Sequence, residues 1–120
     1  MNNLNIGFIG IGLMGLSIVK RLSYLDYKIE AYDKNLEKLD PLKKMSNIKL
    51  IQNASQISKY NDIIILCVDK TENVKEVVFG KDGLVNNANN NTIILDLSTT
   101  LANETIEFAN QLKKTGASWI

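Results

Sequence analysis

Residues 5–15 read Asn-Ile-Gly-Phe-Ile-Gly-Ile-Gly-Leu-Met-Gly, and this short segment sets the architecture of the chain. Residues 5–9 form an apolar strand pattern that runs directly into three glycines with the spacing G-x-G-x-x-G. From Leu13 to Leu25, leucine and valine recur every three or four residues, which is typical of an amphipathic helix. The glycines therefore lie between a predicted strand and a predicted helix, the context in which this motif binds a dinucleotide.

Each glycine of the motif has a distinct predicted role. Gly10 permits a tight turn, Gly12 has no side chain to block a diphosphate, and Gly15 lets the helix pack closely on the strand. The N–H groups at the start of the helix, together with its positive dipole end, then hold the phosphates. The predicted diphosphate-binding residues are Gly10, Gly12, Leu13, Met14 and Gly15. The alternative is a glycine-rich turn that binds nothing, although such a turn would not need three glycines and their entropic cost.

An acidic residue at the end of the second strand completes this fingerprint. The strand predicted over 28–32 ends at Asp33, about 20 residues after the glycines, where a carboxylate accepts hydrogen bonds from the ribose hydroxyls of NAD. Asp33 would also repel the 2′-phosphate of NADP, whereas the neighbouring cation Lys34 would accommodate it. The sequence therefore favours NAD and keeps NADP as the second cofactor. A solvated aspartate that only caps the next segment is the structural alternative.

The rest of the chain repeats the strand–helix pattern. Isoleucine-rich segments alternate with helical ones, as expected around a parallel sheet. Further strands are predicted over 48–51, 63–68, 92–97 and 117–120, and helices over 35–45 (interrupted by Pro41), 55–60, 71–79 and 101–114. We expect an α/β fold, a Rossmann-type doubly wound parallel sheet in the order 3-2-1-4-5-6, formed as a single domain over residues 1–120.

Composition excludes several classes of protein. The 120 residues have 14 basic and 13 acidic side chains, a balance that argues against nucleic-acid binding. No apolar run is long enough for a membrane span, and no signal-peptide pattern is present, so a cytoplasmic protein is expected. The chain has no histidine and one cysteine, Cys67, which excludes histidine-based nucleophilic triads, histidine-ligated metal sites and an internal disulfide. We predict no metal site.

Four stretches together resemble the β-hydroxyacid dehydrogenase family, which includes 3-hydroxyisobutyrate, tartronate semialdehyde and 6-phosphogluconate dehydrogenases. The Met-Gly pair that ends residues 8–15 is typical of that family's glycine motif. Residues 64–69 (Ile-Ile-Leu-Cys-Val-Asp), 73–84 and 96–99 (Asp-Leu-Ser-Thr) are similar to the family's fourth strand, the helix after it and its D-x-S-T signature. The resemblance covers essentially the whole chain in the family's order.

The resemblance implies further site residues. Val68 and Asp69 would line the adenosine side of the cofactor, and Asn73 would approach its nicotinamide half. Thr99 would contact the nicotinamide end, and Ser98 would meet the substrate carboxylate. Alternatives are that Ser98 and Thr99 only cap the helix over 101–114, and that Asn73 is only a surface residue.

The family's all-helical domain, which supplies the catalytic lysine, has no counterpart in these residues. We therefore expect the N-terminal domain of a longer oxidoreductase that transfers a hydride between NAD and a small 3-hydroxyacid, with no catalytic residue in this chain and no turnover by it alone. The alternatives are an NADPH-dependent semialdehyde or imine reductase, or a non-catalytic nucleotide-binding or interaction module. An exposed last strand with Trp119 and Ile120 predicts a homo-oligomer or another association through the C-terminal edge.

Overall fold

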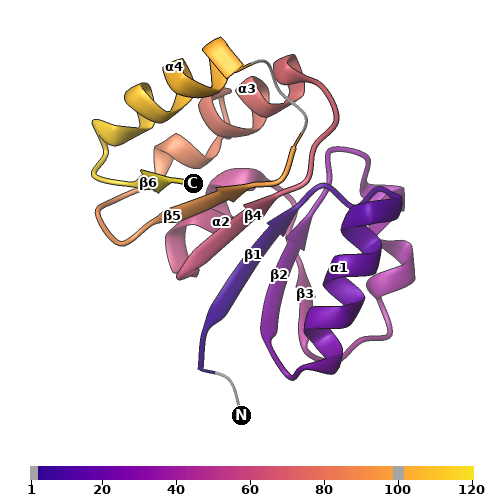
Figure 1. Ribbon diagram of the computed structural model, residues 1–120. Helices are drawn as coiled ribbons and strands as arrows, with labels where there is room; N and C mark the ends of the chain where they lie inside the picture. Colours follow the sequence, from indigo (N-terminus) through magenta and orange to yellow (C-terminus); the bar gives the residue numbers. More distant parts are fainter. Residues whose placement is uncertain (1–2, 99–101) are drawn as a thin grey trace.

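The computed structural model describes residues 3–98 and 102–120. Six parallel strands form one sheet in the order β3-β2-β1-β4-β5-β6 (Figure 1). Their bounds are β1 (Asn5–Ile9), β2 (Lys28–Tyr32), β3 (Ile48–Leu50), β4 (Ile63–Leu66), β5 (Ile93–Asp96) and β6 (Ser118–Trp119). Ile6 of β1 is in register with Ile29 of β2 and with Ile63 of β4. The predicted doubly wound sheet and its strand order are confirmed, and the order reverses between β1 and β4.

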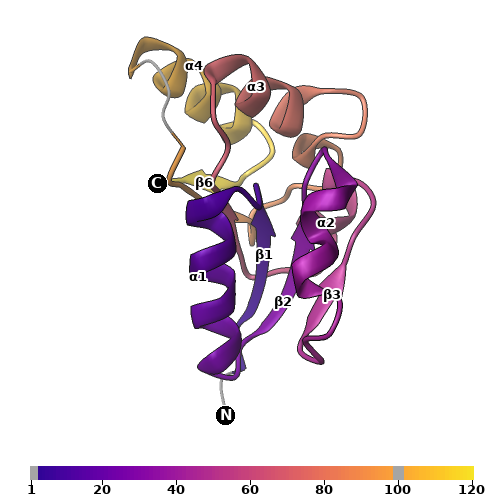
Figure 2. The same cartoon turned by 90° about the vertical axis from the view of Figure 1, so that its right-hand side faces the viewer.

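Helices cover the two faces of this sheet unequally. One face carries α1 (Leu13–Tyr24) and a 3-10 helix, η1 (Leu36–Leu42). The other face carries α2 (Ala54–Tyr60), α3 (Thr71–Phe79), the short 3-10 helix η2 (Leu84–Asn86) and α4 (Ala102–Lys113). Figure 2 shows α1 and α2 on opposite sides of β1 and β2. Within the described ranges, no helix is long and apolar enough to cross a membrane.

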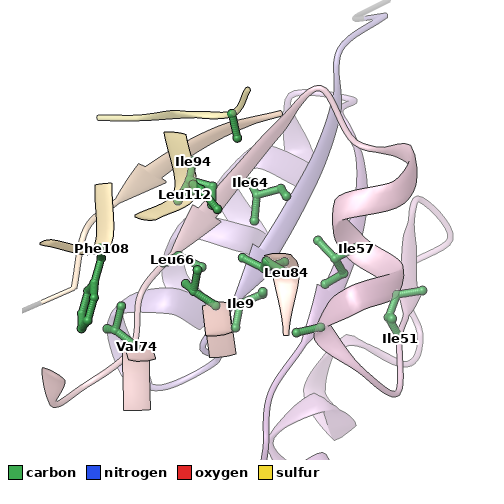
Figure 3. Close-up of a cluster of buried hydrophobic side chains, with 13 residues drawn as sticks. Ile9, Ile51, Ile57, Ile64, Leu66, Val74, Leu84, Ile94, Phe108 and Leu112 are labelled. Carbon is green, nitrogen blue, oxygen red and sulfur yellow. The ribbon is translucent and has the colours of Figure 1, made fainter. Parts of the chain in front are cut away.

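The two faces have separate hydrophobic cores, and β4 contributes to both. Ile64 is fully buried among residues of α2, α3 and α4, while its neighbour Ile65 packs on the face covered by α1. This is why β4 is continuously apolar, since alternate side chains both face a covered layer. Figure 3 shows the core on the face covered by α2, α3 and α4, where Ile9, Leu66 and Val74 lie near the carboxyl ends of the strands. Packed side chains therefore fix the positions of the strand ends that surround the site.

The helix predicted over 35–45 is shorter and of a different type. It is a 3-10 helix that follows Asn35, whose side-chain oxygen accepts a hydrogen bond from the Glu37 N–H at 3.2 Å. Pro41 lies inside this helix, and proline lacks the N–H that an α-helical ladder requires. Leu39 and Leu42 are nevertheless buried, so the segment still packs beside β2 and β3.

The structure corrects part of the prediction that the last strand is exposed. β6 is the edge strand, as expected, but Trp119 does not contribute to an exposed patch. It lies on the same side of the sheet as its register partner Ile94, and its ring packs against Phe108 of α4 with centroids 6.2 Å apart. Because side chains alternate along a strand, Ile120 faces the other side, and it is exposed.

Candidate functional site

Gly10 forms the turn that follows β1. Its φ of +103° lies in the region that L side chains rarely adopt, and a Cβ there would overlap the backbone carbonyl of Cys67. The Gly10 N–H donates to the carbonyl of Tyr32 at 3.0 Å, which ties the turn to the end of β2. Only glycine therefore fits between the ends of β1, β2 and β4.

Gly12 and Gly15 have opposite surroundings. No described atom lies within 4 Å of the position that a Gly12 Cβ would occupy, so this side of the loop is open. A Cβ on Gly15 would instead overlap the carbonyl oxygen of Gly10 and approach the Phe8 ring to 3.2 Å. Gly15 is required by the close packing of α1 on β1. Packing does not require Gly12, and its role in leaving room for a ligand stays a prediction from the motif.

The start of α1 presents donors beside Gly12. Leu16 is the residue whose N–H reaches the Gly12 carbonyl, at 2.8 Å, so the N–H groups of residues 13–15 precede the first helical hydrogen bond. Gly12 has no side chain with which to cap them. The side chains of Leu13 and Met14 are exposed, Leu13 to 93%, and lie outside the cavity described below. These two residues can therefore serve a bound anion through their backbone rather than their side chains.

Only 9% of the Asp33 surface is exposed, and both oxygens of its carboxylate accept hydrogen bonds. Oδ2 accepts from the Ile11 N–H at 2.7 Å, and Oδ1 accepts from the Asn35 N–H at 2.8 Å. The carboxylate does cap the segment after β2, but it is not the solvated residue of the structural alternative. A carboxylate has about four acceptor positions. Asp33 thus keeps acceptor capacity for a ligand while it fixes the glycine loop.

These elements enclose a cavity of about 530 Å³ at the carboxyl ends of β1, β2 and β4. It brings together seven residues that the sequence predicts for cofactor binding: Gly10, Gly12, Asp33, Lys34, Val68, Asp69 and Asn73. It adds six that sequence reasoning missed: Ile9, Asn35, Lys38, Cys67, Glu76 and Val77. Helical spacing was a usable signal for two of them, because Glu76 and Val77 follow Asn73 by three and four residues on α3. The cavity lies where the strand order reverses, the usual ligand position in an open α/β sheet.

The wall after β4 is built differently from the glycine loop. The hydroxyl oxygen of Ser98 accepts from the Val68 N–H at 2.8 Å, and the Ser98 N–H donates to Asp96 Oδ1 at 2.8 Å. Ser98 therefore joins the chain after β5 to the chain after β4, and it does not line the cavity. In the same wall, the side-chain amide of Asn73 donates to Asp69 Oδ1 at 3.2 Å. Thr99 lies outside the described residues.

The segment after β2 is linked to α3 by an ion pair. Lys34 Nζ lies 3.0 Å from Glu76 Oε2, and both side chains are more than half exposed. The two residues also line a smaller neighbouring cavity of about 170 Å³, together with Tyr32 and Lys81. Burial, followed by the nearby carboxylates of Asp33 and Glu76, raises the pKa of the Tyr32 hydroxyl. Tyr32 therefore lies near two carboxylates, and Lys34 and Lys38 are the cations among the described residues that line the larger cavity.

Cys67 lines the cavity as a half-buried free thiol. Burial raises its pKa, and the carboxylate of Asp96 raises it further, so the thiol stays protonated at neutral pH. Among residues 3–98 and 102–120, no group of three or more His, Cys, Asp or Glu side chains is placed to hold a metal ion. The cavity is lined instead by carboxylates, side-chain amides, two ammonium groups and apolar side chains, next to the backbone donors at the start of α1, a set suited to a polar organic ligand.

Residues 5–120 match the family model described as the NAD binding domain of 6-phosphogluconate dehydrogenase. Among curated proteins, the chain is 27% identical over 117 residues to 2-hydroxy-3-oxopropionate reductase of Escherichia coli (strain K12), covering 98% of this chain and 39% of that protein. It is 24% identical over 115 residues to cytokine-like nuclear factor N-PAC of Drosophila melanogaster, covering 95% of this chain and 19% of that protein. The chain thus spans well under half the length of these relatives.

Solved structures agree on the fold. An imine reductase from Myxococcus stipitatus in complex with NADP+ superposes with a TM-score of 0.85 at 17% identity, over 96% of this chain and 39% of that one. A variant of an imine reductase from the same organism in complex with NAD+ gives 0.84 at 18% identity, over 98% and 40%. At these identities the likeness concerns the sheet and its helices.

Proposed function

Because the chain belongs to the family of the NAD binding domain of 6-phosphogluconate dehydrogenase, as the resemblance to β-hydroxyacid dehydrogenases predicts, we propose that it binds NAD in the 530 Å³ cavity. In the whole protein, this domain would present the cofactor to a small 3-hydroxyacid of the 3-hydroxyisobutyrate type. The cofactor would supply the hydride chemistry, and the chain's residues bind and orient it. The comparisons support an NAD(P)-binding domain, and the choice of NAD and of the substrate are our proposals.

The observation that carries the proposal is the contrast between Gly12 and Gly15. Gly15 is explained by internal packing, whereas the space beside Gly12 is open and faces the cavity. The N–H groups at the start of α1 adjoin this space, so a diphosphate placed there would meet orphan donors and the positive end of a helix dipole. A side chain at position 12 would occupy the same space. The fold tolerates a side chain here, and the ligand would not.

The preference for NAD rests on Asp33. Its carboxylate lines the cavity, is held by the N–H groups of Ile11 and Asn35, and retains acceptor positions for two ribose hydroxyls. A 2′-phosphate placed at the same ribose would approach this buried negative charge, which is unfavourable at short range. We assign the ribose to Asp33, and the middle of the cofactor to Val68, Asp69 and Asn73 on the opposite wall.

The substrate side is proposed from the resemblance to the family. Ser98 would meet the substrate carboxylate and Thr99 the nicotinamide end of the cofactor. The Ser98 oxygen accepts from the Val68 N–H, and a hydroxyl can in addition donate one hydrogen bond, as this role requires. We assign no general acid or base to this chain, and we expect it to bind cofactor without turning over substrate. A steady-state rate with any hydroxyacid on the purified chain would contradict this expectation.

Lys34 and Lys38 support a second candidate, an NADPH-dependent reductase acting on a semialdehyde or an imine. Both lysines line the cavity next to Asp33, where a 2′-phosphate would lie. The relatives include a protein named as a reductase, and a fold neighbour was solved with NADP+. A relative named as a nuclear factor keeps a non-catalytic nucleotide-binding module as the third candidate.

The test is calorimetric titration of the chain with NADH and then NADPH, on the wild type and on Gly12→Ala. We expect saturable NADH binding, tighter than NADPH binding, and a loss of at least tenfold in NADH affinity in Gly12→Ala at unchanged stability. Gly15→Ala is the matched control, because the same added methyl there overlaps backbone and lowers the free energy of unfolding. Equal NADH affinity in the wild type and Gly12→Ala would refute the assignment of the loop to the diphosphate.

A further inference from the structure

We infer that Glu76 on α3 is a cofactor-selecting residue: by pairing with Lys34, it withholds the ammonium that would otherwise bind the 2′-phosphate of NADP. This inference rests on the proposed function, since it concerns how the proposed ribose pocket distinguishes two cofactors. Glu76 lies 42 residues from Lys34 in sequence, outside the glycine and aspartate fingerprint of the first two strands. The contact between them exists only in the folded chain.

The geometry places the ion pair at the ribose end of the cavity. Lys34 follows Asp33 directly, and the backbone there is fixed because Asp33 binds the N–H groups of Ile11 and Asn35. The Lys34 side chain extends from this fixed point to α3, where Nζ meets Glu76 Oε2 at 3.0 Å. Both residues line the large cavity and also the smaller one beside it. The ion pair therefore lies between the two cavities, next to the position proposed for the ribose.

The charges around this ion pair disfavour the binding of a phosphate. With Glu76 ionised, the pair is neutral, and the buried carboxylate of Asp33, the residue before Lys34, also lines the large cavity. A 2′-phosphate would have to displace Glu76 from Lys34 while lying close to two carboxylates. A ribose with two free hydroxyls makes no such demand. The pair is more than half exposed, so it adds little to stability, and its effect is on the choice of ligand.

Glu76→Gln tests this role, because glutamine keeps the size of the side chain and removes its charge. The measured quantity is the ratio of the NADPH and NADH dissociation constants, from calorimetry at fixed ionic strength. We expect the ratio to fall by up to about fivefold in favour of NADPH, the fold-change that corresponds to the free energy of an exposed ion pair. Glu72→Gln is the matched control, since it removes the same charge one turn earlier on α3 from an exposed residue outside both cavities. Glu72→Gln should leave the ratio unchanged.

The route through Lys34 is tested by repeating Glu76→Gln in a Lys34→Met background. If Glu76 acts by withholding Lys34, the gain in NADPH affinity disappears in this background. A gain that persists would show that Glu76 repels the phosphate directly and would overturn the inference. An unchanged ratio in Glu76→Gln, with saturable NADH binding retained, would also overturn it while leaving the proposed function intact. Absence of NADH binding in the wild type would refute the proposed function itself.

Discussion

The carboxylate of Asp33 accepts a hydrogen bond from the backbone N–H of Ile11, 22 residues earlier in the chain, at 2.7 Å. This bond joins the end of β2 to the middle of the glycine loop. The Gly10 N–H makes a second link, to the carbonyl of Tyr32. The residue proposed to recognise the ribose therefore also shapes the loop proposed to hold the diphosphate, and the two halves of the fingerprint form one structural unit before any ligand binds.

Asp33→Ala should consequently destabilise the chain as well as weaken NADH binding. The substitution leaves the buried N–H of Ile11 without its acceptor, which costs about 1–3 kcal/mol. Urea unfolding followed by circular dichroism measures the loss, and titration of the folded variant measures the binding defect. Gly12→Ala should show the binding defect without the stability loss.

Asp40→Ala is the control for removal of an acidic side chain. Asp40 pairs with Lys43 at 2.9 Å on the exposed side of η1, where an ion pair contributes about 0–1 kcal/mol. It should change neither the stability beyond that range nor NADH binding. If Asp33→Ala proved as stable as Asp40→Ala, the Ile11 bond would have no energetic role in the loop.

The glycine loop and the sheet were predictable because they depend on local sequence. Gly10 and Gly15 are dictated by a positive φ and by close packing, and both constraints act within the strand–turn–helix unit that contains them. The strand order followed from the glycine fingerprint, which is typical of the doubly wound fold with the order 3-2-1-4-5-6. The helix type after β2 was predicted less well, and Pro41 inside the segment, which lacks a backbone N–H, was the signal against a regular α-helix.

The ion pair between Lys34 and Glu76 was not predictable in the same way. Nothing in the sequence relates these two residues, and their contact depends on how α3 sits over the ends of β1 and β4. The hydrogen bond from the Val68 N–H to the Ser98 hydroxyl was not predicted for a similar reason, since it spans 30 residues and no local pattern indicates it.

Replacing Lys70 with glycine should stabilise the folded chain. It precedes α3 with φ +94° and ψ +139°, a backbone region that is essentially restricted to glycine and costs about 1–3 kcal/mol for other residues. After the entropy that glycine loses on folding, Lys70→Gly should raise the free energy of unfolding by about 1 kcal/mol. Lys75→Gly, on an exposed position inside α3, should lower it by about 1 kcal/mol. Thermal unfolding that moved in the same direction for both variants would argue against strain at Lys70.

Alkylation of Cys67 should report both the pKa of the thiol and the presence of ligand. Burial and Asp96 raise the pKa, so at a given pH less of the reactive thiolate is present than in a free cysteine. The rate with iodoacetamide should reach half of its maximum at a pH above about 8.5, which is the midpoint for a cysteine peptide. Saturating NADH should slow the reaction, because Cys67 lines the cavity. A rate at pH 8 equal to that of the peptide, or one that NADH leaves unchanged, would contradict this assignment.

On the face of the sheet that carries α1, apolar side chains at the start of β5 and just after its end are exposed. Ile93 and Leu97 are exposed, and Ile120 adds to them at the edge, while Trp119 is turned away toward α4. The core on this face is formed by α1 and η1 with β1, β2, β3 and β4, and only Leu95 joins it from β5. The association predicted through the C-terminal edge stays a prediction, and these side chains extend its apolar surface onto the adjoining face.

We propose that a second copy of the chain covers this face, since each copy presents the same apolar stripe and two such stripes can bury one another in a closed symmetric pair. Light scattering after size exclusion should show a dimer at high protein concentration, and Leu97→Ser should shift the population to monomer. Leu36→Ser is the control, because Leu36 is an exposed leucine on η1, away from β5. Its loss should leave the dimer unchanged, as the buried area that drives association would be intact. A wild-type chain that stays monomeric across the concentration range would refute association through this face.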